Sequence, residues 1–576
     1  MKPSPLLLFI VLLSATSWAC AKDIYVSPSG NDQNAGTSAG APLATIAAAS
    51  KLAVAGDNVN LLAGTYNESL VPVNSGTAAA PITYKSSGGP AVIMNVRVGI
   101  LIGSLSYIVI DGINVNGGAQ PPNAKVNSFV TIQNSNHIIV RHGNFKYANG
   151  WAGIDIVGRY GPGQQYYGAV QNYLTGLTSY ITIEDNTIDN VGDYSKPSGD
   201  VIQVALGPVQ HVLIQRNTIL HGGHDLVEFD SDYGVLQDNT LNNSYSDVVS
   251  GDTGYRNVEL QGSYNVIQRN YMAHARRGGG GYVAPVASIR GNENIVRQNV
   301  FFDSIAAGTA TWCGPLAPDV ENIRVYNNTI YQMGGDGWSA WAYATCSTAG
   351  SFVFANNLVA ESRMSPGTLS GVLHGGALID ADIVFAVSGG TGLIDVGRGL
   401  TAGTVVKGNL FAPHGGGPAY VMLLGGDGRV PLSTAAAKYP QFFTGNIEQS
   451  PNFIGAQFKT VADFQLRPNS PGLASGVALT TATSSGTSDH LPVQDSLYFT
   501  DGNGLVPGDT IQLAGTNQRA GILSIDRANN VLILTQAVTF KAGQGISLPY
   551  NGAAPDIGAG VSGVRPLPPV NVTISK

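Results

Sequence analysis

A short apolar phrase that ends in asparagine recurs along the middle of this chain. Seven copies occur, and successive asparagines are 31, 22, 31, 29, 29 and 29 residues apart. A period of this length is typical of a solenoid, in which each repeat adds one coil. The phrases are rich in β-branched residues and too short for helices, so each predicts a strand that turns at the asparagine. The repeated residues are Asn186, Asn217, Asn239, Asn270, Asn299, Asn328 and Asn357.

The repeat predicts an all-β fold, a right-handed parallel β-helix in which the asparagines stack inside as a ladder. A buried amide is costly unless it is hydrogen-bonded, and amides on successive coils can satisfy one another. Glycine accounts for 74 of 576 residues and only 12% of residues are charged, which suits many strands and tight turns. The net charge of −7 gives no general affinity for nucleic acid.

Residues 1–21 have the pattern of a signal peptide. Lys2 is basic, residues 6–13 are apolar, and Ala19-Cys20-Ala21 matches a small-x-small cleavage site. Lipidation of Cys20 is the alternative. The apolar stretch is too short to span a bilayer, and no later run is long enough. We therefore expect a secreted or periplasmic protein without a membrane span.

Export would leave two cysteines, Cys313 and Cys346. An oxidising compartment and an even count predict one disulfide between neighbouring coils, with two free buried thiols as the alternative.

The pattern of strands and turns divides the mature chain into further parts. A short Ala-rich helix that ends near Val54 is expected to cap the first coil, because an open solenoid end exposes apolar side chains. Coils are expected as far as Phe411, followed by an irregular stretch at 412–460. The predicted parts are an N-terminal cap with the first coils (22–91), the β-helix (92–476), a small β-barrel or sandwich insertion (477–552), and the C-terminal β-helix ending with a tail (553–576).

Polar residues lie in the strands between the asparagine phrases. Counting back 11 residues from Asn239 and from Asn270 reaches Glu228 and Glu259, so these two should be neighbours on adjacent coils. Strands in a sheet lie about 4.8 Å apart, which brings such side chains together. The same count from the next asparagine gives Ser288. Period-two alternation places Gln203, Glu228 and Glu259 outward, along a shared open groove.

The segment 220–230 is the most polar part of this predicted sheet. It holds two histidines and three carboxylates within eleven residues. Carboxylates at this spacing suit Ca²⁺, which takes several oxygen ligands. They also suit acid–base chemistry, because like charges held close push their pKa values apart. A solvated turn is the alternative interpretation.

The runs Asp200-Val-Ile-Gln-Val-Ala-Leu-Gly207 and Gly223-His-Asp-Leu-Val-Glu228 resemble the calcium-binding part of the β-helix pectate lyases that carry an Asp-Asp-Gly-x-Asp motif. The resemblance implies Ca²⁺ held by Asp200, Asp225 and Glu228. His224 stands where that family has another aspartate. Glu259 stands where the family has its lysine base.

We predict a polysaccharide-active enzyme and prefer a lyase that cleaves an anionic, uronate-containing polymer by β-elimination. Elimination requires a neutralised carboxylate and a base, and histidine titrates in a useful range for the base. Arginine pairs with carboxylates through two parallel hydrogen bonds. The candidate catalytic residues are His224, Glu228, Arg256 and Glu259. The candidate substrate-binding residues are Gln203, Arg276, Arg277, Tyr282, Arg290 and Tyr166.

Three other functions fit the same pattern. A glycoside hydrolase would use Glu228 and Glu259 as its carboxyl pair, with Asp225 and Asp230 as other partners. A uronate C5-epimerase would share the proton abstraction of a lyase. A carbohydrate-binding solenoid without activity is the third, since a fold alone does not establish function. For each, we expect a monomer.

Overall fold

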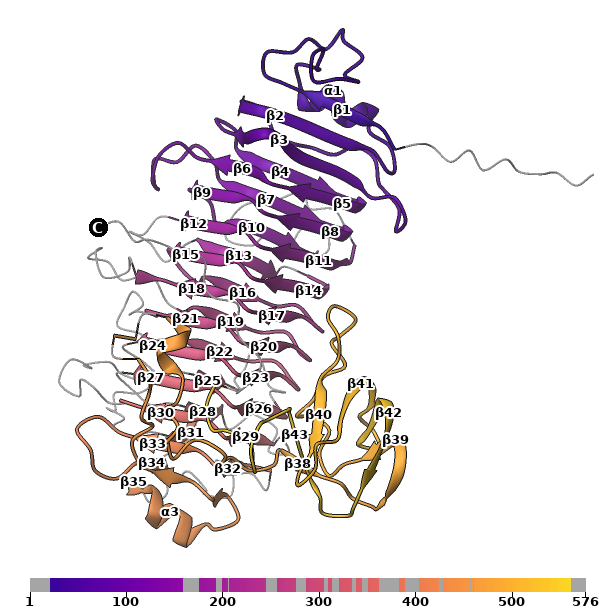
Figure 1. Ribbon diagram of the computed structural model, residues 1–576. Coiled ribbons are helices and arrows are strands. Elements are labelled where there is room, and N and C mark those ends of the chain that lie inside the picture. Colours follow the sequence, from indigo (N-terminus) through magenta and orange to yellow (C-terminus); the bar gives the residue numbers. More distant parts are fainter. Residues whose placement is uncertain are drawn as a thin grey trace, which may run out of the picture.

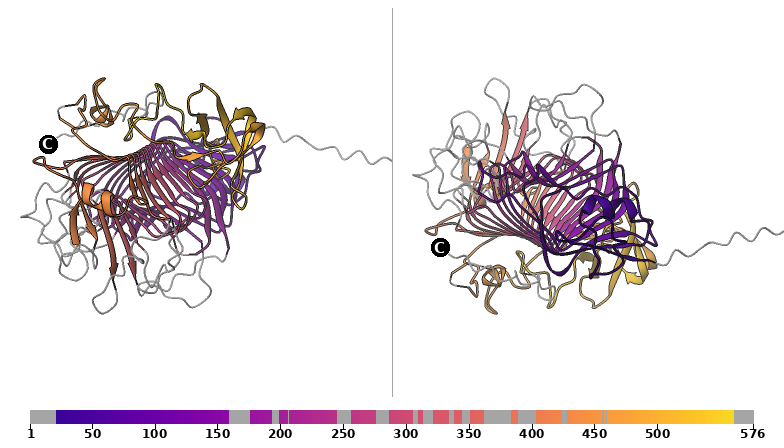
Figure 2. Two further views of the ribbon diagram at one scale, coloured as in Figure 1. Left: turned by 90° about the horizontal axis from the view of Figure 1, so that it is seen from below. Right: turned by 90° about the horizontal axis from the view of Figure 1, so that it is seen from above.

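The computed structural model describes residues 21–158, 176–192, 199–205, 207–244, 256–275, 286–304, 309–312, 321–333, 338–343, 351–361, 383–388, 403–423, 428–455, 457–458 and 460–560. Parallel strands stack coil upon coil along almost its whole length, which confirms the predicted parallel β-helix (Figure 1). Seen from its ends, the coils lie over one another as a stack (Figure 2). Each central coil contributes three strands, one to each of three faces.

Face 1 carries the strands that the sequence marks as polar, and all its pairings are parallel except the last. Its strands are β4 (Val98–Gly103), β7 (Ser128–Gln133), β10 (Ala152–Val157), β13 (Asp200–Ala205), β16 (Val227–Phe229), β19 (Val258–Leu260), β22 (Ala287–Ile289), β25 (Thr309–Trp312), β28 (Trp338–Tyr343), β31 (Ile383–Ser388), β34 (Tyr420–Leu423) and β35 (Gly428–Pro431).

Faces 2 and 3 meet at a sharp corner, and the first strands, β1 (Asp23–Val26), β2 (Asn58–Tyr66) and β3 (Ile82–Ile93), lead into both. Face 2 consists of β5 (Ser106–Asp111), β8 (Asn136–Arg141), β11 (Thr178–Glu184), β14 (Val209–Gln215), β17 (Val235–Gln237), β20 (Val266–Gln268), β23 (Ile295–Arg297), β26 (Ile323–Tyr326), β29 (Phe352–Ala355), β32 (Val405–Lys407) and β36 (Phe443–Thr444). Face 3 consists of β6 (Ile113–Asn116), β9 (Asn144–Ala148), β12 (Thr187–Val191), β15 (Thr218–Gly222), β18 (Thr240–Asn242), β21 (Tyr271–Ala273), β24 (Val300–Ser304), β27 (Thr329–Met333), β30 (Leu358–Ala360), β33 (Leu410–Ala412) and β37 (Ile447–Glu448).

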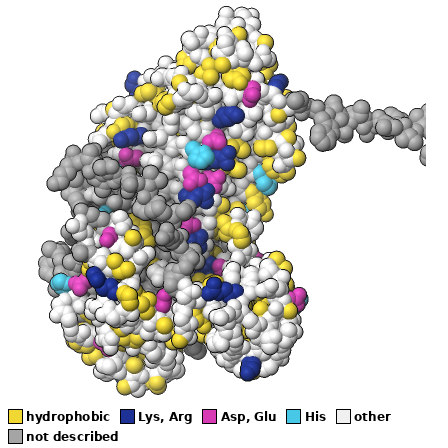
Figure 3. Space-filling model, in the orientation of Figure 1, with side chains coloured by type: hydrophobic (Ala, Val, Ile, Leu, Met, Phe, Trp, Pro, Cys, Tyr) yellow, Lys and Arg dark blue, Asp and Glu magenta, His cyan; other side chains and the backbone are white. Residues whose placement is uncertain are grey.

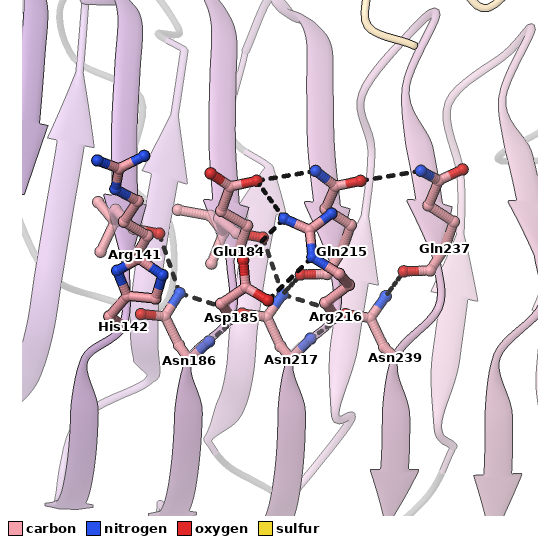
Figure 4. A network of polar contacts seen from close by, with 12 residues as sticks. Arg141, His142, Glu184, Asp185, Asn186, Gln215, Arg216, Asn217, Gln237 and Asn239 are labelled. Carbon is pink, nitrogen blue, oxygen red and sulfur yellow. Dashed lines mark hydrogen bonds and ion pairs between the residues drawn. The ribbon is translucent and has the colours of Figure 1, made fainter. Parts of the chain in front are cut away.

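The predicted asparagine ladder runs inside the corner between faces 2 and 3 (Figure 4). Asn270 is representative: its backbone N and its Nδ2 both donate to Oδ1 of Asn299, each at 3.0 Å, and Nδ2 also donates to the carbonyl of Leu236 at 2.9 Å. The residue before each ladder asparagine turns the chain with a positive φ, such as 54° at Arg216. Each amide of the ladder is thus paired, which is the condition for keeping it in the core.

The ladder is longer than the repeat indicates. Asn357 donates to Asn409, 52 residues on, and Asn409 donates to Asn446, 37 residues on. These two rungs depart from the regular interval, so counting along the sequence does not find them.

Outside the same corner, polar side chains bridge adjacent coils. Arg216 contacts both Glu184 and Asp185 at 2.7 Å, and Gln237 donates to Gln215 at 2.9 Å (Figure 4). The front surface of the solenoid correspondingly shows basic side chains directly beside acidic ones, in a column (Figure 3). Exposed pairs of this kind contribute little individually.

A second column on face 2 consists of stacked aromatic rings. Neighbouring ring centroids are 4.5 to 5.5 Å apart. Each of these residues has a positive φ of 54° to 62°, which is unfavourable for a bulky side chain. Stacking of about 0.5–1.5 kcal/mol per pair offsets that cost. The column consists of Tyr107, His137, Tyr180, His211, Tyr233 and Tyr264.

Short helices lie at the two ends of the solenoid (Figure 1). α1 (Ile46–Leu52) buries Ile46 and Ala49 at the first coils, close to where a helix is expected from the sequence. α3 (Leu432–Lys438) buries Leu432 and Ala435 at the last coils. The stretch at 412–460, expected to be irregular, therefore contains β34 to β37 and α3, and the coils continue past Phe411, where they were expected to end. Among the described helices, none has the length and apolar character needed to cross a membrane.

The predicted insertion forms an antiparallel sheet that lies beside the coils (Figure 1). It packs on face 2 through a shared apolar cluster that includes Val235, Val266 and Ile295. Arg297, 2% exposed, bridges the two parts by pairing with Asp509 at 2.5 Å. Its strands are β38 (Thr480–Thr481), β39 (Gly486–Pro492), β40 (Thr510–Leu513), β41 (Arg519–Asp526), β42 (Val531–Phe540) and β43 (Gly545–Ser547), preceded by the 3-10 helix η2 (Val461–Phe464).

The connections between faces differ in how much their length varies. Five residues lead from face 1 to face 2 in three successive coils, at 230–234, 261–265 and 290–294. The connection from face 3 to face 1 has four residues at 223–226 but fifteen at 243–257 and thirteen at 274–286. Along the rest of the solenoid, the connection from face 1 to face 2 ranges from two residues at 104–105 to twenty at 158–177, and that from face 3 to face 1 from three at 149–151 to twenty-two at 361–382. Variation in coil length is therefore found on both sides of face 1, whereas the corner between faces 2 and 3 always has one or two residues.

Replacing one ladder amide tests the role of the ladder. Asn270→Ala leaves the backbone N of Asn239 and the carbonyl of Leu236 without their partner, so we expect the free energy of unfolding to fall by about 1–3 kcal/mol. Urea unfolding measures the change. Asn144→Ala, at an exposed asparagine of β9, is the matched control and should change stability little. Equal stability of both variants would contradict a structural role for the ladder.

Candidate active site

The outward row of polar residues on face 1 is in the register that the sequence predicts. Gln203 pairs with Glu228, Glu228 with Glu259, and Glu259 with Ser288 on four successive strands. The row extends one coil further, because Asp155 of β10 pairs with Gln203. Asp155 occupies the outward position of an alternating strand, so the same reasoning could have found it.

These side chains are buried, contrary to the expected open groove. Gln203 is 2% exposed, Glu228 7% and Glu259 4%. Their polar groups bind one another and other polar groups at the ends of these strands, and this pairing permits the burial. Polar groups that are paired can be buried at little cost.

Residues at the start of β13 and just before β16 and β19 form an ion-pair network with this row. His224 Nδ1 lies 2.8 Å from Asp200, and the backbone N of Asp225 donates to the same Asp200 oxygen at 2.9 Å. Arg256 donates to both oxygens of Asp225 at 3.0 Å and also contacts Glu259. Asp200 and Asp225 are fully buried, so these donors replace water as their partners.

Contacts from one arginine and two glutamines complete the site. Arg290, just after β22, lies 2.7 Å from Glu259. Gln203 Nε2 bridges Asp200 at 3.3 Å and Glu228 at 2.5 Å. Gln261, which the sequence reasoning did not select, donates to the other Glu228 oxygen at 3.3 Å. The site thus brings together eight predicted residues: Asp200, Gln203, His224, Asp225, Glu228, Arg256, Glu259 and Arg290.

The environments of the two glutamates differ. Burial, with the charges of Asp200 and Asp230, raises the pKa of Glu228 to about 9. Burial also raises the pKa of Glu259, but Arg256 and Arg290 oppose that rise. Glu228 is therefore protonated at neutral pH and can donate a proton, whereas Glu259 lies between two guanidinium groups. Carboxyl groups kept in different states are a common arrangement in acid–base sites.

Other ionisable groups of the site are shifted as well. Burial would lower the pKa of His224, but Asp225 and Asp200 raise it to about 9. Burial would raise the pKa of Asp225, but Arg256 and His224 hold it below its usual range. Burial and Glu259 raise the pKa of Asp230 to about 8. His224 is therefore a cation at neutral pH, and the predicted base role requires an alkaline medium.

The oxygens predicted to bind Ca²⁺ already have partners within the protein. The ligand atoms of Asp200, His224 and Asp225 lie within 4.8 Å of one another, so a group of potential metal ligands exists. However, each oxygen of Asp200, Asp225 and Glu228 accepts a hydrogen bond from a protein donor. Histidine nitrogen is also a poor ligand for Ca²⁺, which prefers oxygen. The set as folded does not fit Ca²⁺.

Several predicted residues lie outside the described part of the chain. These are Arg276, Arg277, Tyr282 and Tyr166 of the substrate-binding set, both members of the predicted disulfide, Cys313 and Cys346, and residues 1–20 of the predicted signal peptide.

No family model matches this chain. Among curated proteins, the uncharacterized protein YwoF of Bacillus subtilis (strain 168) is 43% identical over 72 residues, which cover 12% of this chain and 15% of that protein. Pectate lyase PEL9 of Emericella nidulans is 43% identical over 77 residues, which cover 13% of this chain and 18% of that protein. The chain thus spans less than a fifth of the length of these relatives.

Solved structures with a similar course of the chain include two lyases and a glycosidase. Pectate lyase Pel9A has a TM-score of 0.46 at 14% identity, covering 94% of this chain and 96% of that chain. The PL6 family alginate lyase AlyGC has a TM-score of 0.40 at 13% identity, covering 74% and 57%. The GH136 lacto-N-biosidase from Eubacterium ramulus has a TM-score of 0.36 at 11% identity, covering 56% and 64%.

The protonation of His224 can be measured directly. With histidines labelled with ¹³C, an NMR titration should place the pKa of His224 near 9. Asp200→Asn removes one of the two anions that raise it, so the pKa should fall toward the ordinary value of about 6.5. His490, an exposed histidine in the antiparallel sheet, serves as an internal control and should not respond. A His224 that titrates near 6.5 in the unaltered protein would contradict the described network.

Proposed function

We propose that the chain is a polysaccharide lyase that cleaves a uronate-containing polymer by β-elimination at face 1. One observation carries the proposal: two guanidinium cations, Arg256 and Arg290, and one histidine, His224, surround carboxyl groups that differ in protonation. Cations are what an anionic sugar requires, and a proton donor beside a base is what elimination requires. The short stretch of identity with a pectate lyase supports the same substrate class.

In this mechanism Arg290 and Arg256 neutralise the uronate carboxylate, which makes the C5 proton more acidic. Neutral His224, held at Nδ1 by Asp200, takes that proton with its other ring nitrogen. The electron pair forms the C4–C5 double bond as the C4–O bond breaks. Protonated Glu228 then donates its proton to the leaving oxygen. Gln203, which bridges Asp200 and Glu228, positions the acid relative to the base.

No step of this mechanism uses Ca²⁺, because the oxygens predicted to hold the ion are paired within the protein.

The predicted signal peptide belongs to the same proposal, since it would deliver the enzyme to polymers outside the cytoplasm.

A glycoside hydrolase is the second candidate, and the register of Glu228 and Glu259 favours it. They are direct neighbours on adjacent strands, one protonated and the other paired with two guanidinium groups. A hydrolase needs an acid and a base or nucleophile of this kind. Glu259 is essential in this scheme, whereas in the lyase scheme it only positions the arginines.

The products distinguish the two candidates. The protein is incubated with pectate, alginate and neutral polymers, and the products are analysed by mass spectrometry and ultraviolet absorbance. Elimination should give unsaturated uronides, each lighter by one water than the hydrolytic product. Glu228→Gln should reduce either activity by about 10²–10⁴-fold, because both schemes use it as the acid. Saturated products from the unaltered protein would refute the lyase and favour the hydrolase.

The lyase mechanism also predicts an unusual pH profile. His224 must be neutral, which requires a pH above about 9, and Glu228 must be protonated, which requires a pH below about 9. We therefore expect kcat/KM to have a narrow, bell-shaped dependence on pH with its maximum near pH 9. Asp200 raises both pKa values, so Asp200→Asn should move the whole bell to lower pH. A shift of only one limb would contradict the assignment of acid and base.

A further inference from the structure

Arg256 lies where the acidic groups of the site converge. Its guanidinium binds both oxygens of Asp225 and contacts Glu259, and its backbone N donates to Asp225 at 3.1 Å. The arginine side chain is 11% exposed, and those of Asp225 and Glu259 are 0% and 5% exposed. A buried cation held by two carboxylate partners is a positive charge in a fixed position, and its loss would leave those carboxylates uncompensated.

The other two predicted Ca²⁺ ligands, Asp200 and Glu228, also have all their oxygens paired within the protein. Asp200 is held by His224, by the backbone N of Asp225 and by Gln203. Glu228 is held by Gln203 and Gln261. A divalent ion that reached these oxygens would have to displace such donors and lie beside Arg256 and His224, which repel it. The charges of His224, Arg256 and Arg290 are matched by those of Asp200, Asp225 and Glu259.

We propose that Arg256 takes the place of a divalent cation at this centre, so that the site assembles and is balanced in charge without a metal ion. The binding part of this inference rests on the contacts alone. Its catalytic part, that activity is independent of metal, rests on the proposed lyase function. The guanidinium then provides the fixed positive charge near the substrate that a metal ion would otherwise provide.

Metal binding is tested first on the unaltered protein without substrate. After treatment with EDTA, the protein is titrated with Ca²⁺ while its Tm is followed, and with Tb³⁺ while sensitised luminescence is followed. A ligand that binds the folded state raises the Tm, so we expect a change below about 1 °C at millimolar Ca²⁺ and no saturable luminescence. A saturable signal that Asp225→Asn abolishes would overturn the proposal.

Two substitutions test whether Arg256 is what excludes the metal. Arg256→Gln removes the charge and frees oxygens of Asp225 and Glu259, so this variant should gain a Ca²⁺-dependent rise in Tm of about 3 °C or more. Arg256→Lys keeps a positive charge and is the matched control, which should gain none. A folded Arg256→Gln variant that does not bind Ca²⁺ would overturn the role of Arg256. If Arg256→Gln does not fold, the titration of the unaltered protein still decides the proposal.

Activity measurements keep this inference separate from the proposed function. Lyase activity that persists in EDTA supports both. Lyase activity that EDTA abolishes and Ca²⁺ restores overturns the inference and leaves the lyase proposal intact. Absence of lyase activity, together with absence of Ca²⁺ binding, refutes the lyase proposal and leaves the binding part of the inference intact.

Discussion

Hydrogen bonds between stacked asparagine amides determine how each coil lies on the next. The backbone N and Nδ2 of one asparagine donate to the same oxygen of the asparagine on the next coil. Each coil that carries a ladder asparagine must therefore place that residue directly above the one before it. Coils of 22, 29 and 31 residues obey this constraint equally. The register on face 1 follows from it, and the pairing of Glu228 with Glu259 is one consequence.

The candidate site combines burial with charge in a way that a solvated cluster does not. Its ions are stabilised by one another and not by water, so removal of one partner leaves another unpaired in a medium of low dielectric constant. The same pairing holds Arg256 and His224 in fixed positions before any substrate arrives. Fixed charges that need no reorganisation are the main source of electrostatic stabilisation in enzymes. The pairing that allows burial thus also prepares the site for charged substrates.

The fold and the register of the site could be predicted from the sequence, because both follow from spacing. Period-two alternation and a constant distance from the ladder were sufficient to align Gln203, Glu228, Glu259 and Ser288. The rungs Asn409 and Asn446 were missed, since the chain between rungs is longer there.

The burial of the row and the partners of Arg256 could not be predicted in this way. Arg256 and His224 precede their strands, in connections that have no repeating pattern. Their contacts depend on how the backbone approaches face 1, and that path is set by tertiary packing. The pKa of His224 also depends on this packing, because it is raised by Asp225, the next residue in the chain, and by Asp200, which lies on the preceding coil. Residue identity alone indicated a base of ordinary pKa.

The unequal connections between faces have a consequence for how such proteins diversify. The ladder holds the corner between faces 2 and 3, where the connection always has one or two residues, so an insertion there would break the amide contacts between coils. The connections on either side of face 1 vary in length instead, from two to twenty residues on the way to face 2 and from three to twenty-two residues on the way from face 3. New loops can therefore arise beside Asp225 and Arg256 while the scaffold keeps its stability. A change in these connections alters the surroundings of the row on face 1 and leaves the register of the strands unchanged.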